Sequence, residues 1–325
     1  MKIFTANPSI LWEIGGPHAR EVAGLFHYFF VVESIVFVLV LGFLFWSIRK
    51  NRRSTLEKPF EPSAATEKKG LIGVSINVLL TIFILTSFVA VSYVVDNRLL
   101  KMEKDPELEI EVTAHQWWWE LRYQDKNPSK IFTTANEIHV PVKKKIRFIL
   151  SSSDVVHSFW VPNIAGKKDI IPGRDQDLVI TVDKPGVYHG RCAEFCGNQH
   201  AYMGIVLIAE SEKDFEEWRE HQRKPAMTPV TAEEKHGEEI FQGSACMMCH
   251  TLRTEEQGSL SMNAPDLTHL KSRTTIGAGA APNMKGYLGG WIIDPHSMKP
   301  GVHMPTNLQR PEDFQALLTY LESLK

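Results

Sequence analysis

The chain has 325 residues, of which 43% are hydrophobic, and its 36 Lys and Arg residues against 38 Asp and Glu residues give a formal charge of −2. Because a globular domain averages roughly 150 residues, this length predicts two or three modules. The near-neutral charge disfavours a nucleic-acid binder, which usually carries a clustered basic excess. The four cysteines form two close pairs, Cys192 with Cys196 and Cys246 with Cys249. Such pairs favour metal, haem or redox chemistry over a disulfide scaffold.

Two apolar runs, residues 26–48 and 70–95, are 23 and 26 residues long. Both exceed the roughly 20 residues that cross a bilayer as a helix. Neither keeps the polar face of a buried core helix. Seven basic residues lie between the runs, so the positive-inside rule places this loop in the cytoplasm. We therefore expect residues 1–98 to form an N-terminal segment and a transmembrane helical hairpin, with both termini and everything after about Asp96 on the extracytoplasmic side.

An acidic residue, Glu33, lies inside the first apolar run, where an ionisable side chain is costly. It is either a proton-path or intersubunit group or a residue wetted at the outer interface. Both alternatives favour packing of the hairpin against a larger membrane subunit.

Short alternating stretches follow at residues 107–123, 137–152, 176–192 and 203–210, and no helical pattern separates them. This predicts an antiparallel β-sandwich or barrel over residues 99–212.

Two helix starts follow the predicted strands. Residues 211–224 read as a charged helix with Ser211 as its cap, so residues 213–227 form a linker. Thr231 and Glu234 have the spacing of a capping box and open a third module, residues 228–325.

The first chemical motif is C-x3-C-x3-H-x2-M, formed by Cys192, Cys196, His200 and Met203, with His157 35 residues before Cys192. Two thiolates and two imidazoles are sufficient for tetrahedral zinc. The thioether of Met203 favours copper instead, because it is an unusual zinc ligand. Two cysteine sulfurs can also bridge a pair of copper ions, which spreads the charge of an added electron.

These residues carry a resemblance to a known family. The stretches 154–174, 190–203 and 115–123 resemble cytochrome c oxidase subunit II, which holds the binuclear CuA centre in a cupredoxin-like domain. With the hairpin, the resemblance covers residues 20–212.

The resemblance implies a copper site with two bridging thiolates, two terminal imidazoles and two weak ligands. By position these are Cys192 and Cys196, His157 and His200, and the Met203 sulfur with the Glu194 backbone carbonyl. The Glu194 side chain is also implied to reach a magnesium or manganese ion shared with the catalytic subunit. Asp154 matches a family acid near this region.

The run Trp117-Trp118-Trp119 reads by itself as half-buried strand residues. The resemblance implies that Trp117 is the residue through which electrons enter the copper centre, whereas Trp118 stands where tyrosine is more usual. Glu67 matches an acid at the mouth of a proton channel, although the second run lacks the Trp-Thr and proline pattern of the family.

The second chemical motif, Cys246-x-x-Cys249-His250, is the signature of covalent haem c attachment. The two thiols add to the haem vinyl groups, and His250 falls where it can bind the iron. A methionine as sixth ligand would raise the reduction potential. The candidates downstream are Met262, Met284, Met298 and Met304.

Residues 291–305 resemble the all-α class I cytochrome c domain that is fused to some subunit II proteins. The resemblance implies Met304, 54 residues after His250, as the sixth ligand, and Pro265 as the residue whose carbonyl orients His250. Three further histidines, His269, His296 and His303, are expected to be surface or structural residues.

Together the motifs imply a subunit of a proton-pumping cytochrome c oxidase. The oxygen site itself is not expected in this chain. Electrons would pass from an external donor, a cytochrome c or a docked quinol-oxidising complex, through haem c to CuA and then to catalytic subunit I, which reduces oxygen to water. The motifs also imply further membrane subunits. They imply that the chain spans the plasma membrane of a bacterium twice, with both cofactor domains on the periplasmic side. No nucleic-acid partner is expected.

Three alternatives belong to other classes. A CuA and haem c subunit of a nitrogen-oxide reductase shares both cofactors. A copper-delivery protein would leave His200, Met203 and the haem motif unexplained, and a quinol-oxidase subunit would lack the copper ligands.

Overall fold

The computed structural model describes residues 13–51, 63–102, 104–254, 263–307 and 310–325. The chain divides into two compact units, of which one is Arg20–Met102 and the other holds the remaining described residues.

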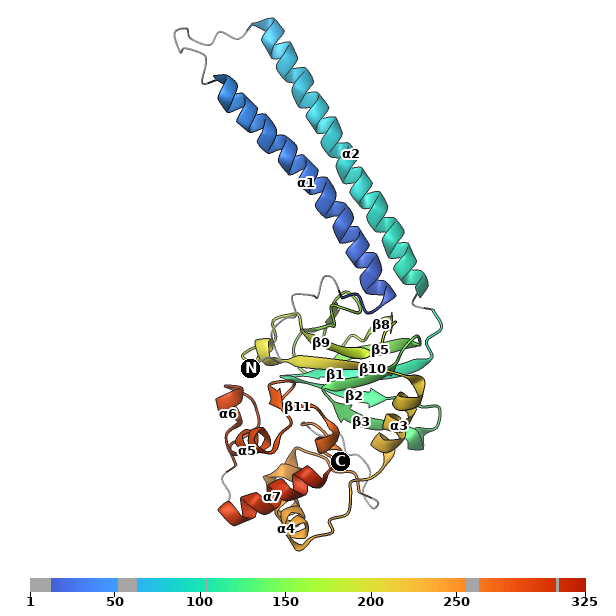
Figure 1. The fold of residues 1–325 in the computed structure, drawn as a ribbon, viewed down its shortest axis with the longest axis vertical. Helices are drawn as coiled ribbons and strands as arrows, with labels where there is room; N and C mark the ends of the chain where they lie inside the picture. Colours follow the sequence, from blue (N-terminus) through green and yellow to red (C-terminus); the bar gives the residue numbers. More distant parts are fainter. Residues whose placement is uncertain (1–12, 52–62, 103, 255–262, 308–309) are drawn as a thin grey trace. The chain divides into compact units, whose positions relative to one another are not determined.

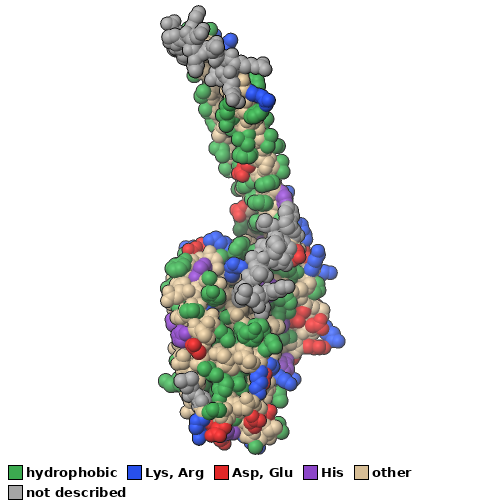
Figure 2. All heavy atoms as spheres, turned by 60° about the vertical axis from the view of Figure 1, so that its left-hand side comes forward, with side chains coloured by type: hydrophobic (Ala, Val, Ile, Leu, Met, Phe, Trp, Pro, Cys, Tyr) green, Lys and Arg blue, Asp and Glu red, His purple; other side chains and the backbone are tan. Residues whose placement is uncertain are grey.

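The first unit is a helical hairpin of α1 (Pro17–Asn51) and α2 (Ala64–Met102) (Figure 1). Both helices are long and apolar enough to cross a membrane. Contacts between the helices include the ring centroids of Phe29 and Phe88, 4.4 Å apart, while the outward side chains are predominantly hydrophobic (Figure 2). The helices extend beyond the predicted spans at both ends. Glu33 and Glu67 are both exposed on the hairpin.

Residues 13–19, which include the first residues of α1, belong to the second unit, whereas the sequence alone grouped the N-terminal segment with the hairpin as residues 1–98. The Gly15 N–H donates to the Asn163 carbonyl at 2.8 Å, and the Asp183 N–H donates to the Gly15 carbonyl at 2.7 Å. A Cβ atom at Gly16 would lie 2.4 Å from the Thr181 carbonyl oxygen. Close backbone approach therefore requires glycine at this position.

The β module consists of two five-stranded sheets with the orders β3-β2-β1-β5-β8 and β4-β10-β9-β6-β7 (Figure 1). The strands are β1 (Leu108–His115), β2 (Trp118–Tyr123), β3 (Phe132–Ala135), β4 (Glu137–Pro141), β5 (Lys145–Ser152), β6 (His157–Trp160), β7 (Lys168–Ile170), β8 (Gln176–Thr181), β9 (Gly186–Cys192) and β10 (Gly204–Glu210). The predicted sandwich is confirmed. Most neighbours are antiparallel, but β1 pairs with β5 and β4 with β10 in parallel, because the intervening chain crosses between the sheets.

The sandwich core follows from alternation along the strands. Successive residues of β1 and β5 alternate between buried and partly exposed positions, as expected for a sheet with one covered face. Val112, Phe148, Phe159 and Leu207 are at most 2% exposed and belong to one hydrophobic cluster. That cluster also contains Cys192, Cys196 and Met203, so the predicted copper ligands border the packed core.

Helix α3 (Glu212–Arg223) follows the sandwich, and both predicted caps are present. The Ser211 hydroxyl accepts from the Asp214 N–H, and Lys224 ends the helix. Thr231 and Glu234 form a reciprocal capping box at the start of α4 (Ala232–Gly243).

The C-terminal module is helical around a small core. Its further elements are α5 (Lys285–Ile293), α6 (Pro295–Met298), α7 (Pro311–Ser323), and the two-residue strands β11 (Thr275–Ile276) and β12 (Ala281–Pro282). Short 3-10 turns lie in this module at η4 (Ala245–Met248) and η5 (Leu270–Ser272), and in the β module at η2 (Pro128–Lys130) and η3 (His200–Tyr202). Phe241, Leu317 and Tyr320 are among the buried core residues where α4 packs on α7. This confirms the predicted all-α cytochrome c type of fold.

Candidate copper centre and haem attachment site

The predicted copper ligands meet at one end of the sandwich. Cys192 ends β9 and His157 begins β6, while Cys196, His200 and Met203 lie on the loop that leads from β9 to β10. Cys192, Cys196, Met203 and His157 are each at most 2% exposed. Two adjacent strand ends and one loop thus bring residues 35 positions apart into a single buried cluster.

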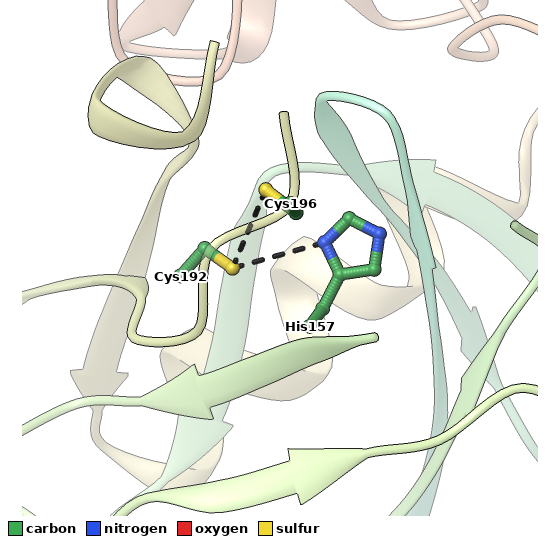
Figure 3. A group of neighbouring side chains, drawn as sticks. All are labelled: His157, Cys192 and Cys196. Carbon is green, nitrogen blue, oxygen red and sulfur yellow. Dashed lines mark hydrogen bonds between the residues drawn. The ribbon is translucent and has the colours of Figure 1, made fainter. Parts of the chain in front are cut away.

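The donor atoms converge without a disulfide. The two cysteine sulfurs are 3.8 Å apart, and His157 Nδ1 lies 3.7 Å from the Cys192 sulfur (Figure 3). His200 Nδ1 lies 3.7 Å and the Met203 sulfur 3.9 Å from the Cys196 sulfur. All four cysteines of the chain are free thiols. Both imidazoles therefore present the same ring nitrogen to the sulfur pair.

The cluster favours a thiolate even without metal. The hydrogen bond with Cys196, aided by His157, holds the pKa of Cys192 far below its usual range. The same pairing raises the pKa of Cys196, and burial adds to that rise. Burial acts to lower the pKa of His157, but its hydrogen bonds with Cys192 and Asp154 outweigh this effect and raise that pKa. Since metal binding requires thiolates and a neutral imidazole, loading the site must release protons.

Asp154 and Gln116 support the ligands from outside the cluster. An Asp154 carboxylate oxygen lies 2.8 Å from His157 Nε2, which directs Nδ1 at the sulfurs, and the carboxylate also accepts from the Gln116 N–H at 2.6 Å. The Gln116 side-chain amide donates to the Cys196 carbonyl at 2.7 Å. Such partners orient metal-binding histidines. Sequence reasoning noted Asp154 without a role and missed Gln116, whose only signal is its place before the tryptophan run.

Glu194 turns its backbone and its side chain in different directions. Its carbonyl oxygen lies 3.2 Å from the Cys192 sulfur, next to the donor cluster. Its side chain is 43% exposed and lies 3.9 Å from the Lys167 ammonium. The carbonyl is thus placed among the donors, while the carboxylate is accessible from outside.

The three tryptophans have three different environments. Trp119 is fully buried in the sandwich core, and Trp118 stacks on His115 with ring centroids 4.3 Å apart. Trp117 is 6% exposed, and its indole N–H donates to the Cys196 carbonyl at 2.9 Å. Its other neighbour is His303, whose ring centroid is 5.0 Å away. His303, expected to be a surface or structural residue, is exposed and contacts this indole.

The haem motif begins at η4 in the C-terminal module. Cys246 is half-buried and Cys249 exposed, so both thiols are open to a cofactor. His250 Nδ1 lies 2.8 Å from the Pro265 carbonyl, the contact that the sequence predicts. That hydrogen bond leaves Nε2 for iron, and burial lowers the pKa of His250, which favours the neutral ligand form.

Met304 and Cys246 both pack, partly buried, against the core of the C-terminal module. The predicted haem ligand and one attachment thiol therefore border the same core. Met298 packs there too, while Met284 is 60% exposed, and Met262 lies outside the described residues. His269 is structural, because its ring nitrogens lie 2.6 and 3.0 Å from the Lys325 and Lys224 carbonyls. His296 Nδ1 accepts a hydrogen bond from the Gly301 N–H.

Both donor sets fit the groups that the sequence predicts. Two buried thiols, two imidazoles and a thioether are soft donors of the kind that copper takes, and the thioether sulfur sits against a thiol in the structure. The haem motif offers two unpaired thiols and a histidine with one nitrogen already engaged. The fold and the sites define a two-span protein with a cupredoxin-like domain and a cytochrome c domain.

Comparisons with known proteins agree with this class. Residues 108–210 match the family of the cytochrome c oxidase subunit II periplasmic domain, and residues 234–325 match the cytochrome c family. Cytochrome c oxidase subunit 2 of Alkalihalophilus pseudofirmus is 32% identical over 318 residues, which are 95% of this chain and 89% of the relative. The Bacillus subtilis subunit 2 is 32% identical over 67% of this chain and 62% of its own length. The solved periplasmic domain of subunit II from Bradyrhizobium japonicum is 32% identical over 37% of this chain and 96% of that one, with a TM-score of 0.35.

The chain belongs to the cytochrome c oxidase subunit 2 family and carries a cytochrome c domain at its C-terminal end. Membership implies CuA copper, haem c, an electron-transfer role and association with subunit I of a haem–copper oxidase. The two apolar helices fit a bacterial membrane protein.

Paired cysteine substitutions test the two sites separately. Cys196→Ser is expected to lose the copper while keeping one covalent haem, because a serine hydroxyl cannot replace a thiolate as a soft donor. Cys249→Ser is expected to keep two coppers and to lose normal two-thioether haem attachment. Metal analysis and haem spectra on both variants check this, each serving as the control for the other. Stoichiometric zinc without copper in metal-replete protein would contradict the copper assignment.

Met304→Leu tests the sixth haem ligand. The haem should stay attached, but its reduction potential should fall, since the thioether stabilises ferrous iron. The exposed Met284 supplies the matched control, and Met284→Leu should leave the potential unchanged. An unaltered potential and spectrum in Met304→Leu would place the ligand elsewhere, with His303 as the next residue to substitute.

Proposed function

We propose that this chain receives electrons from an external donor at its haem c domain and passes them through CuA to subunit I, which reduces oxygen to water and pumps protons. Cys246, Cys249, His250 and Met304 would hold the haem. Cys192, Cys196, His157, His200, Met203 and the Glu194 carbonyl would hold two coppers. When bound, these groups would supply one-electron redox chemistry.

The observation that carries this proposal is the position of Trp117. Its indole N–H is bonded to the carbonyl of Cys196, and its ring lies against His303, the neighbour of Met304. One buried aromatic side chain thus contacts a copper-ligand residue on one side and the haem-ligand segment on the other. This supports Trp117 as the route by which electrons reach the copper centre.

The protein's own residues prepare the copper site for fast transfer. The two cysteines, His157 and Met203 are shielded from water and His200 is partly buried. Asp154 and Gln116 fix His157 and the Cys196 backbone by hydrogen bonds. A site held by such partners reorganises little when its charge changes. The same shielding limits the reaction of the thiolates with solvent oxidants.

The membrane arrangement follows from charge. The basic residues of the loop between the helices favour the cytoplasmic side, so both termini and both cofactor domains would lie on the periplasmic side. The exposed Glu194 carboxylate is then available to a magnesium or manganese ion shared with subunit I. The donor would be a cytochrome c or a docked quinol-oxidising complex, and further membrane subunits would cover the hairpin.

Gas-uptake measurements on the complex purified through this chain test the function. Subunit I should copurify, and a reduced donor should drive oxygen uptake with proton release. Cys196→Ser should abolish donor-driven uptake, because electrons cannot reach subunit I without the copper centre. A complex that reduced a nitrogen oxide and did not consume oxygen would support the reductase alternative and overturn this proposal.

A further inference from the structure

A buried carboxylate of the β module takes its hydrogen bonds from the haem module. Glu137 begins β4 and is 3% exposed. Its Oε1 accepts from the backbone N–H groups of Thr274 at 2.9 Å and Thr275 at 2.8 Å, and from their hydroxyls at 2.7 and 3.0 Å. Its Oε2 lies 3.0 Å from the Thr274 nitrogen.

Other carboxylates of the sandwich behave differently. Glu107, Glu109 and Glu111 form ion pairs with Lys144, Arg147 and Arg122, all within the β module. By contrast, every hydrogen bond that the Glu137 side chain makes with described residues comes from Thr274 and Thr275. A buried carboxylate is costly unless donors replace its water, and for Glu137 those donors belong to another module.

The same interface reaches the copper-ligand loop. The Lys299 ammonium, on a residue that is 1% exposed, donates to the carbonyls of Trp117 at 3.1 Å and Gly277 at 3.0 Å. The Gly204 N–H, next to Met203, donates to the Ala278 carbonyl at 3.0 Å. The segment that follows β11 therefore bonds directly to the start of β10, and Lys299 links it to the Trp117 carbonyl.

We propose that Glu137 is a positioning residue. Its hydrogen bonds with Thr274 and Thr275, called the clasp below, fix the C-terminal haem module in one orientation against Trp117 and the copper-ligand loop between β9 and β10. The inference rests on the proposed electron transfer from haem c to CuA. Its new element is that the module is held in place at a defined residue and does not search for its position on a flexible tether.

The geometry of the clasp explains how one residue can set an orientation. Four donors on two consecutive residues converge on a single oxygen atom, so a shift of Thr274 and Thr275 relative to β4 would break several hydrogen bonds at once. Bonds to an ionised acceptor are also stronger than neutral ones. Because electron transfer weakens steeply with distance, an orientation held by the clasp keeps His303 beside Trp117 for every turnover.

Rapid photoreduction of haem c in the intact complex, followed by the rate of CuA reduction, tests the clasp. In the wild type this rate should not depend on solvent viscosity, since no docking motion precedes transfer. Glu137→Ala leaves four donors without their acceptor and should slow transfer at least about tenfold, which equals about 1.4 kcal/mol. The residual rate should fall as viscosity rises, because the module must now find its position.

Two further substitutions separate positioning from general damage. Glu137→Gln should give an intermediate rate, because the amide oxygen can occupy the place of Oε1. Glu111→Ala removes a carboxylate from the same module and should transfer at the wild-type rate. If Glu137→Ala fails to fold, Thr274→Val with Thr275→Val removes the two hydroxyl donors and keeps the β-branched shape. That double variant should slow transfer about threefold, or about 0.7 kcal/mol.

Hydrogen exchange gives a readout that needs no electron transfer. The Thr274 and Thr275 amides should be protected in the wild type and exchange faster in Glu137→Ala, while the haem and copper spectra stay native. The proposed role of Glu137 would be overturned if Glu137→Ala transferred electrons and exchanged its amides at the wild-type rates. It would also be overturned if the transfer rate of the wild type depended on viscosity. If haem c never reduced CuA in the wild type, the proposed function would fail, and the exchange data would still decide whether Glu137 holds the modules together.

Discussion

The hydrogen bond from the Trp117 indole to the Cys196 carbonyl is the contact on which the arrangement of the two sites depends. The backbone carbonyl of the same tryptophan accepts from Lys299 of the haem module, and its ring faces His303. Trp117, a residue of the β module, therefore also contacts the haem module through two of its residues. Any movement of the haem module would disturb a residue bonded directly to the copper-ligand loop, so the two sites share one structural support.

Burying charged side chains between the two modules costs free energy, and hydrogen bonds to paired polar groups offset that cost. Glu137 and Lys299 are both almost fully buried. Glu137 takes its hydrogen bonds from across the interface, and Lys299 finds one of its two acceptors there. Buried polar groups that are paired in this way favour one orientation of the two modules, because another orientation would leave them without partners. Hydrogen bonds also fix the residues around the predicted copper ligands. Asp154 orients His157 and Gln116 holds the Cys196 backbone, although neither is a ligand itself.

Local spacing predicted the residues of each site, whereas the junction between the sites could not be predicted. The C-x3-C-x3-H-x2-M and C-x-x-C-H motifs lie in short segments, and apolar run length reveals membrane helices directly. Glu137 and Thr274 are 137 residues apart, and Trp117 and Lys299 are 182 apart. Alternation along a strand shows which face is covered, but it does not show what covers it. For that reason the sequence carried no signal for the contact of His303 with Trp117, or for the hydrogen bonds that join residues 13–19 to the β module.

In the proposed function the haem domain is the copper centre's own electron donor. The most direct measurement is the rate of CuA reduction after rapid reduction of haem c, followed over a wide range of protein dilution. Transfer within one chain predicts a rate that does not change with concentration. A rate that fell in proportion to concentration would show transfer between molecules and would contradict the account.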